Sequence, residues 1–167
     1  AMRILIVDDN PSLVNVFAKL LQIKGFFVST ETTLQGGLRR IQNKQYHVVF
    51  LDVPIDNYDE SQILTILNKK NVLRKTKVFL FSSIDIDVAE LDKWKQQGLY
   101  SYLKKPIKRS SLLQSLDEIR IQINSDTRQK ESKPQPVEDE ATPEQIARLE
   151  QLQKQIQELE SQPKPKP

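Results

Sequence analysis

The chain has 167 residues and a net charge of +3, and its length allows one domain with a real core and a short extension. It has no cysteine, which excludes a disulfide framework and a thiolate metal site. Its longest apolar runs, such as "ILIV" and "VFLF", are far shorter than the roughly 20 residues that span a membrane. No stripe of basic and aromatic residues indicates nucleic-acid binding, so we expect a cytoplasmic protein that binds neither nucleic acid nor membrane.

Up to about residue 125, short apolar runs alternate with segments of helical periodicity. The runs that indicate strands are "RILIV" at 3–7, "FFVST" at 26–30, "HVVFL" at 47–51, "KVFLF" at 77–81 and "SYL" at 101–103. A helical segment follows each of them, which predicts an α/β domain over residues 1–125. In this domain a five-stranded parallel sheet carries crossover helices on both faces.

Several of these helices have ends that can be recognised in the sequence. Pro11 opens the first helix and Gly25 lies just past its end. The third helix is predicted at about 59–70 and the fourth at about 86–97, and the fifth begins near Ser110.

The composition changes after residue 125. Residues 126–141 contain a single large apolar side chain and predict a flexible linker. Residues 142–162 predict a short amphipathic helix that resembles a coiled coil, and residues 163–167 a disordered end. The apolar positions of this predicted helix, in 3-4-3 spacing, are Leu149, Leu152, Ile156 and Leu159. Because two heptads are few, this helix is expected to fray, to dock on the domain or a partner, or to self-associate weakly.

Polar side chains stand where four of the predicted strands end. They are Asp8 and Asp9, Asp52, Ser82 and Lys105, in chain order. Because ligands of open parallel sheets bind outside the carboxyl ends of the strands, we expect these side chains to share one pocket. Three carboxylates about 5 Å apart repel by roughly 3 kcal/mol per pair at an effective dielectric of about 20, so they need a cation. Oxygen ligands of this kind suit Mg²⁺.

These residues resemble the receiver domain of bacterial two-component response regulators. The resemblance rests on "VDD" after the first strand, "LD" ending the third, a hydroxyl residue ending the fourth and "KP" after the fifth. It covers residues 3 to about 123 and implies a flavodoxin-like (βα)5 fold with strand order 2-1-3-4-5.

The resemblance also implies a role for each pocket residue. Asp52 would be the phosphoacceptor, and Asp8, Asp9 and Asp52 would hold Mg²⁺ with the backbone carbonyl of Pro54. Lys105 would pair with the phosphoryl group. The peptide bond from Lys105 to Pro106 is expected to be cis. We select Lys105 rather than its neighbour because adjacent strand residues face opposite ways.

The expected switch consists of Ser82 and Tyr102. Ser82 would donate its hydroxyl to the phosphoryl group, and Tyr102 would rotate into the space that this movement opens. The output surface would be the fourth helix, the fifth strand and the fifth helix, including Trp94, Lys95, Tyr102 and Lys108. The competing interpretation of Tyr102 is that it is a half-buried tyrosine of the fifth strand without a switching role.

The loop after Asp52 departs from the family pattern. Ile55 and Asp56 stand where Met-Pro is common, and Asp59 and Glu60 where Asp-Gly is common. Side chains two positions after the acceptor and after Ser82 influence the access of water in this family. Both are apolar here, Pro54 and Ile84, so we expect slow self-dephosphorylation. His47 is interpreted as a surface histidine rather than a phosphate carrier.

The leading hypothesis is a stand-alone receiver that accepts a phosphoryl group from a histidine kinase or histidine phosphotransfer protein and then changes its binding to a downstream protein. No enzymatic activity is expected beyond self-phosphorylation from small phosphodonors and slow self-dephosphorylation. Two alternatives stay open. One is an interaction scaffold that works without phosphorylation. The other is a Mg²⁺-dependent phosphohydrolase with an aspartyl-phosphate intermediate, a class with D-x-D after its first strand, where this chain has Asp8-Asp9-Asn10.

Overall fold

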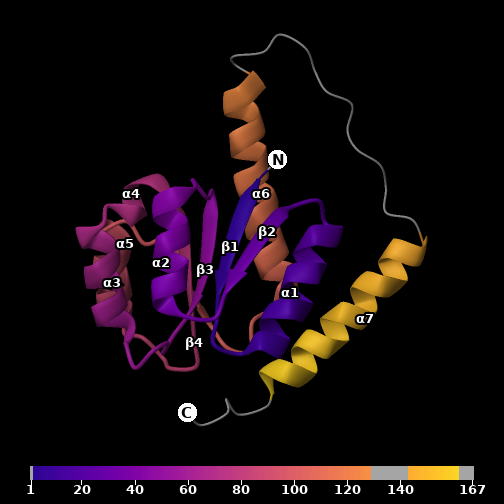
Figure 1. Cartoon of the computed structure of the whole chain (residues 1–167), viewed down its shortest axis with the longest axis horizontal. Helices are drawn as coiled ribbons and strands as arrows, with labels where there is room; N and C mark the ends of the chain where they lie inside the picture. Colours follow the sequence, from indigo (N-terminus) through magenta and orange to yellow (C-terminus); the bar gives the residue numbers. More distant parts are fainter. Residues whose placement is uncertain (1, 129–142, 162–167) are drawn as a thin grey trace.

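A computed structural model of the chain describes residues 2–128 and 143–161. Five parallel strands form one sheet in the order β2-β1-β3-β4-β5, which confirms the predicted α/β class and strand order (Figure 1). The strands are β1 (Arg3–Val7), β2 (Phe27–Glu31), β3 (Val48–Asp52), β4 (Lys77–Ser82) and β5 (Ser101–Lys104). All five residues of β3 are buried, as expected for the central strand of a parallel sheet.

Helices cover both faces of this sheet. They are α1 (Pro11–Ile23), α2 (Leu34–Asn43), α3 (Glu60–Lys69), α4 (Val72–Lys75), α5 (Val88–Gln96), α6 (Arg109–Arg128) and α7 (Pro143–Glu160). One core cluster lies between the sheet and helices α1, α6 and α7, and the other between the sheet and helices α2 to α5 (Figure 1). Among the helices of the described residues, none has the length and apolar character needed to cross a membrane.

Local sequence explains where α1 and α3 begin, at the edge of the sheet formed by the carboxyl ends of the strands. The side chain of Asn10 accepts a hydrogen bond of 3.3 Å from the Leu13 N–H, and Pro11 occupies the first position of α1. Asp59 and Gln62 form a reciprocal capping box that starts α3. Both helices therefore begin directly after loops that leave the carboxyl ends of β1 and β3.

The structure corrects the predicted boundaries in two places. Helix α4, a single short turn between α3 and β4, was not predicted, and it begins after Asn71 with a left-handed φ of 58°. Helix α6 continues to Arg128, so the first three residues of the segment predicted as a linker, 126–141, are helical. The rest of that segment and the predicted disordered end, 163–167, lie outside the described residues.

Helix α7 packs against α1 on the outside of the domain (Figure 1). Leu149, Leu152 and Ile156 are buried and belong to the core cluster beneath α1, while Leu159 is half-buried. Of the alternatives left open by the sequence, the structure therefore shows docking on the chain's own domain.

Candidate functional site

Three carboxylates meet at the carboxyl end of the sheet. Oxygen atoms of Asp8, Asp9 and Asp52 lie within 4.8 Å of one another. Asp8 and Asp52 are 5% and 1% exposed, and Asp9 faces solvent. Two buried carboxylates and one accessible carboxylate form an all-oxygen donor set of the kind that binds a hard, partly hydrated cation, so these residues fit Mg²⁺.

The loop after β1 holds Asp8 in place through backbone bonds. The Asp8 N–H donates to the carbonyl of Glu31 at 3.0 Å, which extends the pairing of β1 with β2. The Asp8 carboxylate in turn accepts the Asn10 N–H at 2.9 Å, and Asn10 caps α1. The position of this carboxylate is therefore coupled to the start of a helix.

Lys105 completes the charged cluster from the other side. Its ammonium forms an ion pair with Asp52, and its side chain is largely buried. The Lys105 N–H donates to the Ser82 carbonyl at 2.7 Å, and the bond from Lys105 to Pro106 is cis, as the resemblance implied. Lys104 points instead to solvent, where it pairs with Asp85 at 2.6 Å.

The hydroxyl of Ser82 lies in a buried network. Ser82 is 1% exposed, and its Oγ donates to Oε1 of Glu60 at 2.8 Å while it accepts the Ile84 N–H at 3.3 Å. The Ile84 carbonyl accepts the hydroxyl of Tyr102 at 2.5 Å. The Tyr102 ring lies 6.3 Å from that of Trp94, between centroids, and burial raises the pKa of Tyr102. Glu60 was not among the predicted site residues.

The loop after Asp52 has an irregular backbone. The bond from Val53 to Pro54 is cis, and Asp56 and Asn57 have positive φ angles of 50° and 65°. The Asp56 carboxylate accepts the Leu34 N–H at 2.7 Å, so this loop is tied to the start of α2.

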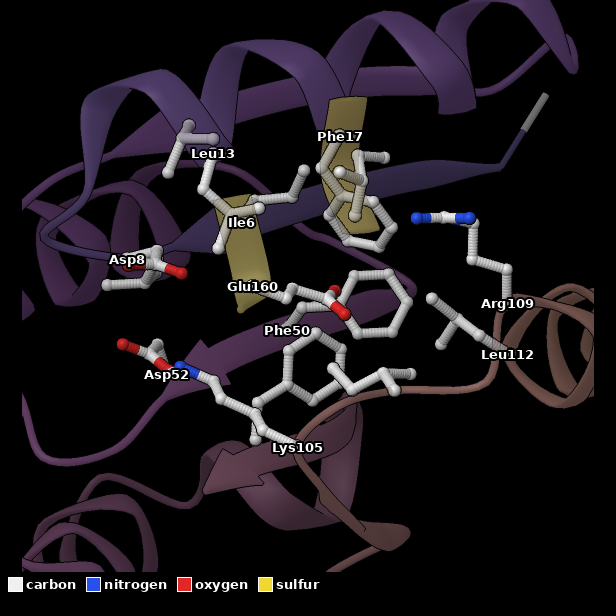
Figure 2. A pocket seen from close by; sticks show the side chains of 15 residues that line it. Ile6, Asp8, Leu13, Phe17, Phe50, Asp52, Lys105, Arg109, Leu112 and Glu160 are labelled. Carbon is white, nitrogen blue, oxygen red and sulfur yellow. Dashed lines mark ion pairs between the residues drawn. The ribbon is translucent and has the colours of Figure 1, made fainter. Parts of the chain in front are cut away.

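A cavity extends from the carboxylates toward α7. Asp8, Asp52 and Lys105 line one part of it, and Glu160, at the end of α7, points into it between the aspartates and Arg109 (Figure 2). Burial raises the pKa of Glu160, although Arg109, the Ile107 N–H and Lys105 oppose this effect. Burial also lowers the pKa of Arg109. Sequence reasoning missed both residues because neither follows a strand.

His47 stands at the opposite end of β3 from Asp52. It is half-buried, and its Nδ1 accepts the Arg3 N–H at 2.9 Å. Burial, followed by the positive charge of Arg3, lowers the pKa of His47. His47 is therefore a structural neighbour of β1 and not part of the pocket.

Comparison with known proteins identifies the domain. Residues 4–117 match the family model for the response regulator receiver domain. The transcriptional regulatory protein GlrR of Escherichia coli (strain K12) is 29% identical over 119 residues, which are 70% of this chain and 26% of GlrR. Protein PilG of Pseudomonas aeruginosa is 23% identical over 112 residues, which are 67% of this chain and 82% of PilG. The chain thus spans about a quarter of the length of GlrR.

Solved structures show the same fold. A two-component response regulator from Clostridium difficile has a TM-score of 0.64 at 18% identity, covering 74% of this chain and 99% of that chain. A CheY-like response regulator receiver domain protein from Methanospirillum hungatei JF-1 has a TM-score of 0.62 at 22% identity, covering 74% and 98%. Since the family model spans most of the sheet and its strand-end residues, the chain belongs to the response regulator receiver domain family.

Proposed function

We propose that the domain is the phosphoacceptor receiver of a two-component or phosphorelay pathway. Asp52 accepts a phosphoryl group from a histidine kinase or a histidine phosphotransfer protein, and the phosphorylated domain changes its binding to a downstream protein. The observation that carries this proposal is the buried Asp52 carboxylate, paired with Lys105 and within 4.8 Å of Asp8 and Asp9.

The chemistry needs a carboxylate nucleophile and positive charge around it. An oxygen of Asp52 attacks phosphorus, the P–N bond of the phosphohistidine breaks, and its electron pair stays on the imidazole nitrogen. Lys105 meets the negative charge of the equatorial phosphoryl oxygens. Asp8, Asp9 and Asp52, with the Pro54 carbonyl, would hold a Mg²⁺ ion, which would supply further positive charge for the crowded oxygens.

The phosphoryl group then acts on protein binding through the switch residues. Ser82 donates to a phosphoryl oxygen, and the loop that carries Ile84 and accepts the Tyr102 hydroxyl moves with it. The output surface consists of α5, β5 and α6, which correspond to the fourth helix, fifth strand and fifth helix of the sequence prediction. Such a switch shifts the balance between existing conformations by about 1–3 kcal/mol.

The site is proposed to hold its phosphoryl group for a long time and to turn over no other substrate. Pro54 and Ile84 lack polar side-chain atoms, so neither positions a water molecule for attack on phosphorus. Self-dephosphorylation is therefore slow, and loss of the phosphoryl group from the purified protein within seconds would contradict this expectation.

Incubation with acetyl phosphate and Mg²⁺ tests the proposal. We expect the full chain to gain the mass of one phosphoryl group, and Asp52→Asn or added EDTA to abolish the gain. Asp85→Asn is the matched control, because Asp85 is an exposed carboxylate that pairs with Lys104 rather than Lys105, and it should not affect the gain. No gain in the parent chain would favour the interaction scaffold, whereas continuous release of phosphate would favour the phosphohydrolase.

A further inference from the structure

The buried carboxylate of Glu60 lies outside the metal cluster and has no role in the chemistry described above. Glu60 is 8% exposed, at the first position of α3. Within residues 2–128 and 143–161, none of the three ion pairs includes it. Burial of a carboxylate is unfavourable unless hydrogen bonds compensate for the lost water, and the bond from Ser82 at 2.8 Å supplies such compensation.

Glu60 is not needed to start its helix. Asp59 and Gln62 already satisfy the first backbone groups of α3 with their reciprocal capping box. The Glu60 side chain extends instead to the end of β4, 22 residues further along the chain. Its main polar contact is thus with the switch hydroxyl, and not with its own helix.

A serine hydroxyl has one proton to donate. In this structure Ser82 donates that proton to Glu60 and accepts the Ile84 N–H with its oxygen. Ser82 therefore cannot donate to a phosphoryl oxygen on Asp52 and to Glu60 at the same time. The same hydroxyl also contacts the loop whose Ile84 carbonyl binds Tyr102, so its direction bears on both predicted switch residues.

We propose that Glu60 is a positioning residue that holds the Ser82 hydroxyl in the unphosphorylated state and competes with the phosphoryl group for its proton. This inference rests on the proposed phosphoacceptor function. Glu60 thereby stabilises the inactive conformation, and activation requires the Ser82 hydroxyl to exchange one acceptor for the other.

Beryllofluoride, which imitates a phosphoryl group on a carboxylate, provides the test. We would titrate it into the full chain with Mg²⁺ and follow the fluorescence of Trp94, the single tryptophan, which packs near Tyr102. Glu60→Gln keeps the size of the side chain but makes it a neutral, weaker acceptor. We expect about tenfold tighter beryllofluoride binding, the usual difference between a charged and a neutral acceptor. Glu144→Gln, at an exposed first-turn glutamate of α7 that lies outside the output surface, is the matched control and should leave binding unchanged.

A double-mutant cycle separates positioning from general effects on the fold. In the Ser82→Ala background, where no hydroxyl remains, Glu60→Gln should not change the affinity. Equal effects of Glu60→Gln in both backgrounds would overturn the inference. It would also be overturned if Glu60→Gln changed neither the beryllofluoride affinity nor the melting temperature of the chain that keeps Ser82. No response of the parent chain at all would contradict the proposed function itself, and is therefore distinguishable from a failure of Glu60 alone.

Discussion

Adjacent residues at the end of β5 have opposite environments. Lys105 is largely buried and pairs with Asp52, whereas Lys104 is exposed and pairs with Asp85. Successive strand side chains point to opposite sides, so only one lysine of the pair reaches the carboxylates. Two residues of the same type therefore have different environments here, because their side chains lie on opposite sides of the chain.

His47, at the opposite end of β3, permits a prediction about how the folding stability depends on pH. Its pKa is lowered in the folded chain, so as the pH falls through about 6.5 the unfolded chain binds the proton first, and folding stability decreases. Protonation also removes the Nδ1 acceptor of the Arg3 N–H, a bond worth about 1 kcal/mol.

We therefore expect His47→Asn, whose side-chain oxygen can accept the same N–H without titrating, to lose less stability between pH 7 and pH 5.5 than the parent chain. Urea unfolding at both pH values measures this difference. Parallel losses in the two proteins would show that His47 does not contribute to the acid sensitivity.

At the scale of elements, α7 extends the core beyond the sheet and its two layers of helices. Ile156 is 1% exposed and belongs to the same cluster as Phe17 of α1 and Leu112 of α6. An isolated helix of this length is marginal in water, so α7 owes its stability to this packing.

Substitution of one apolar residue should therefore undock the helix. We expect Ile156→Asp to lower the free energy of unfolding by about 2–4 kcal/mol, because a buried aliphatic side chain is lost and a charge takes its place. Ile146→Asp is the control on the same helix, since Ile146 is 46% exposed, and should cost well under that amount. Denaturant unfolding and hydrogen exchange of the α7 amides measure both effects, and equal results for the two variants would argue against docking.

Helix α7 and the Asp52 carboxylate share a cavity, which predicts that they influence each other. Glu160 and Asp52 both line it, and Lys105 and Arg109 lie beside Glu160 (Figure 2). A phosphoryl group on Asp52 adds negative charge to this enclosed space and attracts Lys105. Beryllofluoride should therefore increase hydrogen exchange of the α7 amides, and Glu160→Gln should reduce this increase. Unchanged exchange in a chain that binds beryllofluoride would contradict the coupling.

At the scale of the whole molecule, intramolecular packing occupies the apolar positions that would otherwise pair two chains. Leu149, Leu152 and Ile156 face α1 in this structure. The weak self-association predicted for residues 142–162 would have to break these contacts first.

We therefore expect the full chain to sediment as a monomer. Analytical ultracentrifugation over a range of concentrations provides the measurement. A dimer that Ile156→Asp dissociates would show that the helix prefers a second copy over its own domain.

Much of this protein was predictable from local patterns in its sequence. Apolar runs and helical periodicity predicted five strands and the helices between them, because the period of a strand or helix is a property of adjacent residues. The positions of the polar residues at strand ends predicted that Asp8, Asp9, Asp52 and Lys105 would lie together, since parallel strands share one carboxyl edge.

Tertiary structure decided the contacts between segments that carry no common pattern. The bond from Ser82 to Glu60 depends on how α3 lies against the end of β4, and the place of Glu160 depends on how α7 docks on α1. An amphipathic sequence specifies which side of a helix is apolar, but the surface that covers it is selected by the packing of the whole chain. The sequence by itself thus determined the sheet and the polar residues at its carboxyl edge, and the fold decided which buried groups lie beside those residues.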